Sequence, residues 1–293
     1  MIMSNEIYRF GAGSIECITV SDGTFTYAPP QFPPPAALLF MNAPKERLDQ
    51  ALLEHQILAE KWEEWTSPYI CLVVKTSDHL VLVDTGAGGL APTTGRLIQN
   101  LKTVGITPAD FDTVILTHAH PDHISGNTDA RGDPAFPNAR YVIWKDEWDF
   151  WTSDLPERVL DEHVRDTLIR YARQNLPPIE GKVYLMADEE EIVPGIRAVR
   201  APGHTPGHMA LEISSNGDRL LCISDVALHP LHLEHPEWYA AVDIAPDQAV
   251  ATRRKLFNRA TNRKALVLAF HFPFPGLGRL AQAREGWQWQ PIG

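Results

Sequence analysis

The sequence predicts a layered α/β protein. Paired apolar segments occur in both halves of the chain, amphipathic helical segments lie between them, and several strands end directly in a loop that carries His or Asp. The 293 residues could form two domains of ~150 residues each, but single α/β domains also reach this size. Because no linker, internal repeat or low-complexity tract interrupts the pattern, we expect one domain over residues 1–293.

The first part of the chain is predicted to form a hairpin followed by a Pro-rich extension. Residues 7–10 and 14–21 mix β-branched and aromatic side chains on either side of Gly11, which predicts two strands. Residues 27–35 contain too many prolines for a central strand, and residues 44–65 have a helical pattern. We therefore expect an N-terminal extension over residues 24–66, acting either as a flap or as a subunit interface.

The rest of the chain alternates strands and helices. Residues 69–75 and 79–84 predict a hairpin, residues 93–104 a helix that stops at Gly105, and residues 113–117 a short buried strand. Residues 209–214 and 219–224 predict a hairpin around Asn216 and Gly217, since Asn-Gly favours a turn whose twist matches the strands. The other expected elements are strands at 141–144 and within 183–201, helices at 156–174 and 246–260, and a last strand at 265–270.

Composition and charge limit the partners of the chain. Its 26 Lys and Arg residues stand against 37 Asp and Glu residues, giving a net charge of −11 that repels polyanions, so we expect no nucleic-acid partner. The longest apolar runs fall far short of the ~20 residues of a bilayer-spanning helix, so we expect no membrane partner. Three scattered cysteines and charged residues near the start favour a cytoplasmic protein.

A dense group of metal-binding residue types follows the strand at 113–117. His118, His120, Asp122 and His123 lie within six residues, and imidazole nitrogen and carboxylate oxygen are ligands that zinc takes in proteins. Two metal ions need more ligands than one loop provides. The additional candidates follow later predicted strands and are His204, Asp225 and His271.

These motifs resemble those of the metallo-β-lactamase superfamily: His-x-His-x-Asp-His, then Gly-His-Thr-Pro-Gly-His, then an Asp and a His in the same order. The resemblance implies a four-layer αββα sandwich with two metal ions, most simply two zinc ions, in a cleft at one edge of its sheets. It also implies that Asp225 bridges the two ions and that Asp84, in Val-Asp-Thr-Gly, lies behind the ligand histidines. The implied ligands of the first ion are His118, His120 and His204, and those of the second are Asp122, His123 and His271.

The resemblance further implies a hydrolase. Two divalent ions and two carboxylates leave a net positive charge, which lowers the pKa of a bridging water to ~7 and holds a hydroxide nucleophile at neutral pH. One ion then polarises the carbonyl or phosphoryl oxygen of the substrate. We expect Asp122 and Asp225 to act in catalysis by orienting the hydroxide, and Asp122 to pass a proton to the leaving group.

Several segments are most similar to the branch that contains methyl-parathion-hydrolase-like enzymes and quorum-quenching lactonases. Many lactonases of this branch have Tyr three residues after the bridging Asp, where this chain has Leu228, as the organophosphate hydrolases do. An apolar pocket built from Leu90, Trp151, Leu228 and Phe272 would accept a neutral ester, so a lactone, an aryl ester and an organophosphate triester are the expected substrates. The sequence leaves open whether the chain forms a homodimer.

Two other functions stay open at this point. A thioesterase of the glyoxalase II type shares the motif set, although only 22 residues follow His271 where those enzymes carry a helical region. An iron-dependent redox enzyme of the same fold belongs to a different class. We expect His208 to be a structural residue, because the seven named ligands already fill two sites, and His229, His232 and His235 to lie in a loop that lines the cleft.

Overall fold

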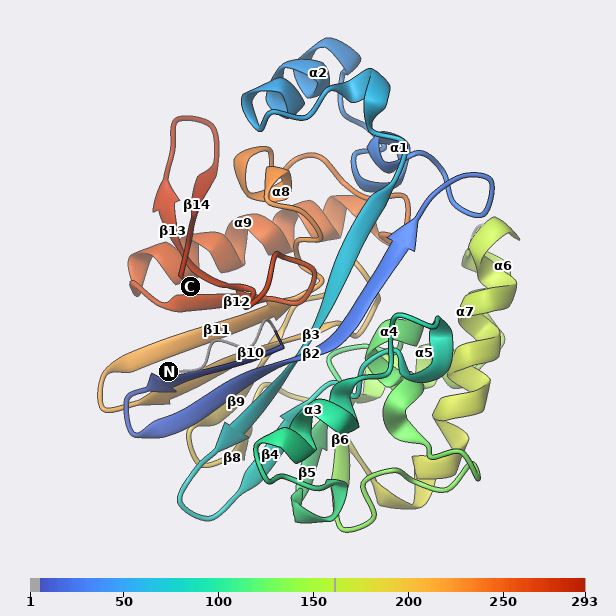
Figure 1. The fold of residues 1–293 in the computed structure, drawn as a ribbon, viewed down its shortest axis with the longest axis vertical. Helices are drawn as coiled ribbons and strands as arrows, with labels where there is room; N and C mark the ends of the chain where they lie inside the picture. Colours follow the sequence, from blue (N-terminus) through green and yellow to red (C-terminus); the bar gives the residue numbers. More distant parts are fainter. Residues whose placement is uncertain (1–5, 161, 293) are drawn as a thin grey trace.

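Two seven-stranded β-sheets pack face to face, with helices on both outer faces (Figure 1). This computed structural model describes residues 6–160 and 162–292. One core cluster lies between the two sheets. A second lies between the first sheet and the helices α3 (Leu97–Thr103), α5 (Lys145–Thr152) and α7 (Glu162–Asn175), and a third between the second sheet and α9 (Pro246–Asn262). This arrangement is the four-layer αββα sandwich that the resemblance implied.

Each sheet is formed by consecutive strands. The first runs in the order β1-β2-β3-β4-β5-β6-β7, with parallel pairing from β4 to β7, and the second in the order β14-β13-β12-β11-β10-β9-β8, with β11 and β12 parallel. The strands of the first sheet are β1 (Ile7–Ala12), β2 (Ile15–Tyr27), β3 (Trp65–Lys75), β4 (Leu80–Val83), β5 (Thr113–Ile115), β6 (Arg140–Trp144) and β7 (Val183–Met186). Those of the second are β8 (Glu191–Val193), β9 (Ile196–Arg200), β10 (Met209–Ser215), β11 (Asp218–Ser224), β12 (Leu266–Ala269), β13 (Leu277–Gln282) and β14 (Trp287–Pro291).

The helices cover the outer faces and the ends of the sheets. In Figure 1, α9 lies along the second sheet, and α1 and α2 lie above α8. The helices are α1 (Pro35–Leu39), α2 (Lys45–Glu54), α3 (Leu97–Thr103), α4 (Pro121–Ile124), α5 (Lys145–Thr152), α6 (Leu155–Val159), α7 (Glu162–Asn175), α8 (Leu231–Glu234) and α9 (Pro246–Asn262). Within the described residues, no helix combines the length and apolar character that a membrane span requires.

Strand β3 shows why the central layers form. Successive side chains of a strand point to opposite faces, so a strand that is apolar throughout must be covered on both. Tyr69, Cys71 and Val73 belong to the cluster under the helices, whereas Ile70 and Leu72 belong to the cluster between the sheets. Apolar runs without alternating polar residues therefore indicate strands that are buried on both faces.

Three of the element predictions are wrong. The helix expected over residues 44–65 ends at Glu54, because Gln56 takes a left-handed backbone conformation (φ 62°), and Trp65 instead begins β3. The helix expected over 156–174 is divided into α6 and α7, since the backbone at Leu160 is extended. The strand after residue 265 is not the last, because β13 and β14 complete the second sheet.

The predicted N-terminal extension is the connection between two long strands. β2 and β3 pair continuously out to Tyr27 and Trp65, and the segment between them carries α1 and α2. Its residues Leu39 and Phe40 are buried in a cluster with Leu228, from the loop after β11. The extension is thereby fixed to the loop that follows Asp225.

A buried carboxylate ties α9 to the second sheet. Glu212 in β10 forms ion pairs with Arg219 of β11 and with Arg259 and Arg263 of α9. Burial alone would raise the pKa of Glu212, but the arginines outweigh it and lower the pKa below 4.5.

Replacing Glu212 by Gln should therefore remove part of the acid sensitivity of the fold. A group with a depressed pKa in the folded state stabilises above its unfolded pKa, and this stabilisation is lost as the pH falls through the folded value. We expect the wild type to exceed Glu212→Gln in unfolding free energy by about 1 kcal/mol at pH 7, and the difference to vanish at acidic pH. Urea unfolding at both pH values checks this; an equal difference at both would contradict it.

Candidate metal centre

The candidate ligands lie in loops at one edge of the two sheets. β5 runs parallel to β4 and β6, and the loop after it carries His118 and His120. Likewise β11 and β12 run parallel, so the residues that follow them, Asp225 and His271, come out at the same edge. His204 lies in the loop between β9 and β10. Topology thus brings together motifs that are more than 150 residues apart.

The α4 helix shapes the first loop. His120 is its N-cap residue in extended conformation, and Pro121 occupies the first helical position, where its missing N–H costs nothing. The short helix then turns Asp122 and His123 back toward the centre. All of these side chains are buried.

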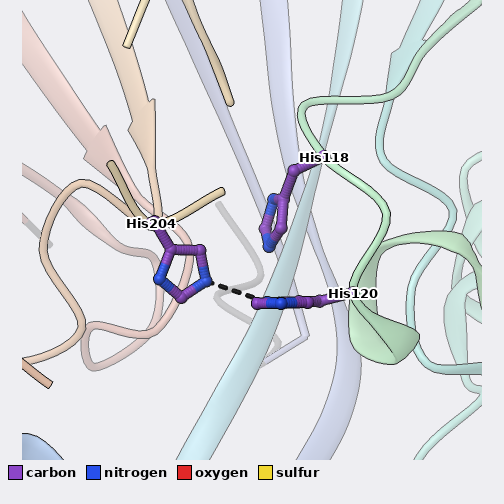
Figure 2. Close-up of side chains that lie close together, drawn as sticks. All are labelled: His118, His120 and His204. Atoms are coloured by element: carbon purple, nitrogen blue, oxygen red, sulfur yellow. Dashed lines mark hydrogen bonds between the residues drawn. The ribbon is translucent and has the colours of Figure 1, made fainter. Parts of the chain in front are cut away.

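The side chains form two groups. The ligand atoms of His118, His120 and His204 lie within 4.8 Å of one another, and the same holds for a second group made of Asp122, His123, Asp225 and His271. Figure 2 shows the three imidazoles of the first group pointing toward one another, with His204 Nε2 2.9 Å from His120 Nδ1. The structure thus brings together all seven residues that the sequence singled out.

Asp225 contacts both groups. Its Oδ2 lies 3.4 Å from His204 Nε2 and 3.7 Å from His118 Nε2, which belong to the first group. The same carboxylate lies 3.0 Å from His271 Nε2 and 3.3 Å from His123 Nε2 in the second. This is the position that a bridging carboxylate requires.

The residues present fit two zinc ions. Among the described residues, the buried Nε2 atoms of His118 and His123 have no hydrogen-bond partner, which is costly unless something absent from the protein chain satisfies them. The donor set is imidazole nitrogen and carboxylate oxygen, the set that zinc prefers. The orphaned nitrogens and the donor chemistry therefore point to metal ions.

Burial also affects the protonation of the first group, although Asp243 and Asp225 outweigh it at His204 and raise the pKa of that residue. Burial lowers the pKa of His118 and His120 well below 6.5, with neighbouring histidines adding to the effect, so both rings are neutral and keep a lone pair for a metal. Burial would raise the pKa of Asp225, but His271, His123 and His118 hold it well below its usual value. The bridging carboxylate is therefore ionised.

Three of the five candidate ligand histidines, His123, His204 and His271, are held from behind through Nδ1. Asp84 lies 2.8 Å from His123 Nδ1, and it also accepts bonds from the amide and hydroxyl of Thr117. Ser67 Oγ lies 2.7 Å from His271 Nδ1, and Asp243 2.9 Å from His204 Nδ1. Such contacts orient the ring and leave Nε2 directed at the metal.

Ser67 and Asp243 were missed by sequence reasoning. Asp243 lies in an irregular stretch without a motif, and it is fixed by the buried Arg253, 2.8 Å away. Ser67 could have been found: together with Trp65 and Tyr69 it occupies alternate positions on one face of β3. The helix predicted over residues 44–65 includes Trp65, and it therefore conceals the alternating pattern at the start of β3.

The other histidines have structural contacts. His208 Nε2 accepts a hydrogen bond of 3.2 Å from the amide of Asp225, and His208 belongs to neither ligand group, as predicted. His232 Nδ1 accepts from the amides of Leu228 and His229, and its Nε2 donates to the Leu39 carbonyl at 2.8 Å. His232 thereby connects the extension to the loop after Asp225.

The four predicted pocket residues have different surroundings. Trp151 lies beside the centre, its ring 5.6 Å from that of His120, and Leu228 packs under the extension. Leu90 is half-buried at the margin of the cluster that contains Trp151. The prediction for Phe272 is wrong, because this side chain is fully buried between the second sheet and α9 and contacts Trp289.

An aromatic wall of Phe25, Tyr27, Phe32 and Trp65 lies beside the second group. Trp65 is 5.9 Å from the ring of His271, and Tyr27 stacks on Trp65 at 5.0 Å. Phe25 and Phe32 pack against Tyr27 at 4.8 Å each. The wall combines the end of β2, the start of β3 and the extension.

Comparison with known proteins gives concordant findings. Residues 67–271 match the family described as the metallo-beta-lactamase superfamily. An N-acyl homoserine lactonase of Bacillus thuringiensis is 26% identical over 228 residues, covering 70% of this chain and 81% of that protein. A Bacillus sp. N-acyl homoserine lactonase is 27% identical over 226 residues, with the same coverage.

Two solved structures match nearly the whole chain. AidC, a dizinc quorum-quenching lactonase in complex with a product, is 27% identical with a TM-score of 0.86, and the match covers 98% of both chains. The hydrolase AbOPH, in the beta lactamase superfamily, is 28% identical with a TM-score of 0.85 and the same coverage. With its fold, its two ligand groups and these matches, the chain belongs to the metallo-beta-lactamase superfamily and is a metal-dependent hydrolase with two zinc ions.

Proposed function

We propose that this enzyme opens neutral lactones. An N-acyl homoserine lactone is the substrate that tests this proposal best. The observation that carries the proposal is the position of Asp225 between two ligand groups beside an aromatic wall. The similarity to proteins named N-acyl homoserine lactonases and to a dizinc lactonase supports it. Aryl esters and organophosphate triesters present the same combination of a polarisable oxygen and an apolar substituent.

The protein's own groups have distinct tasks in this reaction. Two zinc ions bound here would supply a water-derived nucleophile at neutral pH and polarise the carbonyl oxygen of the substrate. Asp225 holds the two ligand groups together. Asp122, 8% exposed and 3.5 Å from His271 Nε2, is placed to take the proton of the attacking water and pass it to the leaving alkoxide. Water adds across the acyl C–O bond, giving a carboxylate and an alcohol.

We assign the apolar substituent of the substrate to the aromatic wall. The extension over residues 24–66 then covers the cleft and excludes water, which strengthens the electrostatic interactions within it. Met41 and Leu53, in the outer part of the extension, are 64% and 60% exposed. An extension that instead serves as a homodimer interface would use these outer residues.

Replacing Phe32 by Ala should raise KM for an N-acyl homoserine lactone with a long acyl chain several-fold, because the wall loses one of its rings. We expect kcat and metal content to change little, since Phe32 belongs to neither ligand group. Leu53→Ala, an apolar truncation on the outer face of the same extension, is the matched control. If Leu53→Ala converts a dimer to a monomer while Phe32→Ala leaves KM unchanged, the extension is an interface.

A hydrolysis panel tests the proposed function. The zinc-loaded protein is assayed by proton release with N-hexanoyl homoserine lactone, an aryl acetate, an aryl phosphotriester, a glutathione thioester and a cephalosporin. We expect turnover of the lactone and weaker turnover of the other neutral esters, with no turnover of the cephalosporin. Efficient cephalosporin hydrolysis without ester hydrolysis would contradict the proposal, and preference for the thioester would favour the glyoxalase II type.

A further inference from the structure

Glu147 is a buried carboxylate that sequence reasoning did not single out. It lies in the first turn of α5, is fully buried, and has no Lys or Arg in salt-bridge distance within the described ranges 6–160 and 162–292. An unpaired buried carboxylate is costly unless hydrogen bonds satisfy its oxygens. We therefore ask which hydrogen bonds compensate the cost of burying Glu147 and what they hold in place.

Four donors converge on this carboxylate. Oε1 accepts from the Ala119 amide at 2.9 Å and from Trp151 Nε1 at 2.7 Å. Oε2 accepts from Thr205 Oγ1 at 2.7 Å and from the Gly207 amide at 2.9 Å. Each oxygen thus satisfies two donors, and bonds to an ionised acceptor are among the stronger hydrogen bonds of a protein.

The two oxygens hold different loops. Ala119 lies between His118 and His120, and Trp151, which shares Oε1 with it, has its ring 5.6 Å from that of His120. Thr205 directly follows His204. The three imidazoles of Figure 2 come from these two loops, so the carboxylate of Glu147 links the loops that carry them.

Gly207 shows how closely this contact is built. A Cβ atom at this position would lie 2.3 Å from the backbone nitrogen of Glu147 and 2.6 Å from its Cβ. Any side chain at residue 207 would therefore push the His204 loop away from α5. The short Thr-Pro-Gly sequence allows the loop to approach.

We infer that Glu147 is the positioning residue of the three-histidine group, and that it sets the metal affinity of His118, His120 and His204 by fixing one loop to the other. The inference rests on the proposed function only in that these histidines bind a metal ion. The second group does not depend on Glu147, because its histidines are held by Asp84 and Ser67. The effect of Glu147 is therefore specific to one of the two sites.

Glu147→Gln tests this inference. Glutamine keeps the shape and one acceptor oxygen, but its amide nitrogen cannot accept from the donors of the other loop. We expect about a 10–100-fold lower zinc affinity at the three-histidine group, the range found when groups that orient metal ligands are removed. The affinity of the other group should stay unchanged. Both are measured by zinc titration against a chromophoric chelator, and Co²⁺ absorption follows the geometry of the sites.

Two further variants separate positioning from stability. Asp22→Asn alters another buried carboxylate that accepts several backbone amides, from Ala87, Gly95 and Leu97, and contacts neither ligand group. It should lower the unfolding midpoint without changing metal affinity. Thr205→Val removes a single donor from Oε2, and it should lower the affinity of the three-histidine group by a few-fold.

The outcomes distinguish this inference from the proposed function. If Glu147→Gln lowers the unfolding midpoint while both zinc affinities match the wild type, the residue is structural and the inference is overturned. An equal loss at both groups would overturn it as well. A wild-type protein that binds two ions but opens no ester would refute the proposed function and leave Glu147 as the positioning residue.

Discussion

Replacing Asp225 by Ala should reduce bound zinc from two ions per chain to less than one, and ester hydrolysis by about 10³-fold or more, since metal ions contribute several kcal/mol to such reactions. The reason is its contact with both ligand groups, at 3.0 Å from His271 Nε2 and 3.4 Å from His204 Nε2. Without this carboxylate, the two groups lose the anion that contacts both of them.

The matched control is His208→Gln. His208 is buried against the same loop and accepts the amide of Asp225 through Nε2, and the Gln side-chain oxygen can accept the same bond. We expect this variant to retain two zinc ions by elemental analysis and most of the activity. Retention of both ions by Asp225→Ala, or loss of both by His208→Gln, would show that the ligands are assigned incorrectly.

Replacing Asp84 by Ala should lower the unfolding free energy by about 3–5 kcal/mol, because each buried donor that loses its acceptor costs about 1–3 kcal/mol. The change leaves His123 Nδ1 and both donors of Thr117 without their acceptor. Because the His123 ring is then free to turn, we also expect about a 10–100-fold lower metal affinity at the second group.

Asp78→Ala, at the exposed turn before β4, is the control for this variant. In the described part of the chain, the carboxylate of Asp78 has one hydrogen-bond partner, the hydroxyl of the neighbouring Ser77. Urea unfolding and chelator competition should leave it indistinguishable from the wild type. If Asp84→Ala also keeps wild-type stability and affinity, the outer carboxylate does not orient His123.

The candidate ligands that the structure brings together could be predicted from the sequence because their signal is local. His118, His120, Asp122 and His123 occupy a single turn, and such a turn after a buried strand has few structural explanations. His204, Asp225 and His271 were found because each follows a strand. Parallel strands place their carboxyl ends at one edge, so strand ends in the sequence become neighbours in space.

The surroundings of the ligands could not be predicted in the same way, because they depend on contacts between distant segments. Glu147 meets its partners across 28 and 58 residues, and Asp243 meets His204 across 39. Phe272 directly follows His271 in the sequence and was expected in the pocket. Consecutive residues can face opposite sides, and the structure buries Phe272 on the side of α9.

The extension was recognised from its prolines, but its connection to the centre was not. The prolines indicate a segment that is not a central strand, and they carry no information about the surface it covers. The aromatic wall forms because β2 and β3 pair out to Tyr27 and Trp65. The long-range register of two strands, rather than any local motif, creates the aromatic wall beside the second group.

We propose that two zinc ions, bound in these two groups, together support the opening of a neutral lactone. The direct measurement is a titration of the metal-free protein with zinc, following the hydrolysis of N-hexanoyl homoserine lactone at each addition. We expect the rate to rise until two equivalents are bound and then to stay constant. A rate that reaches its maximum at one equivalent, or a protein that binds two equivalents and hydrolyses neither the lactone nor another neutral ester, would contradict it.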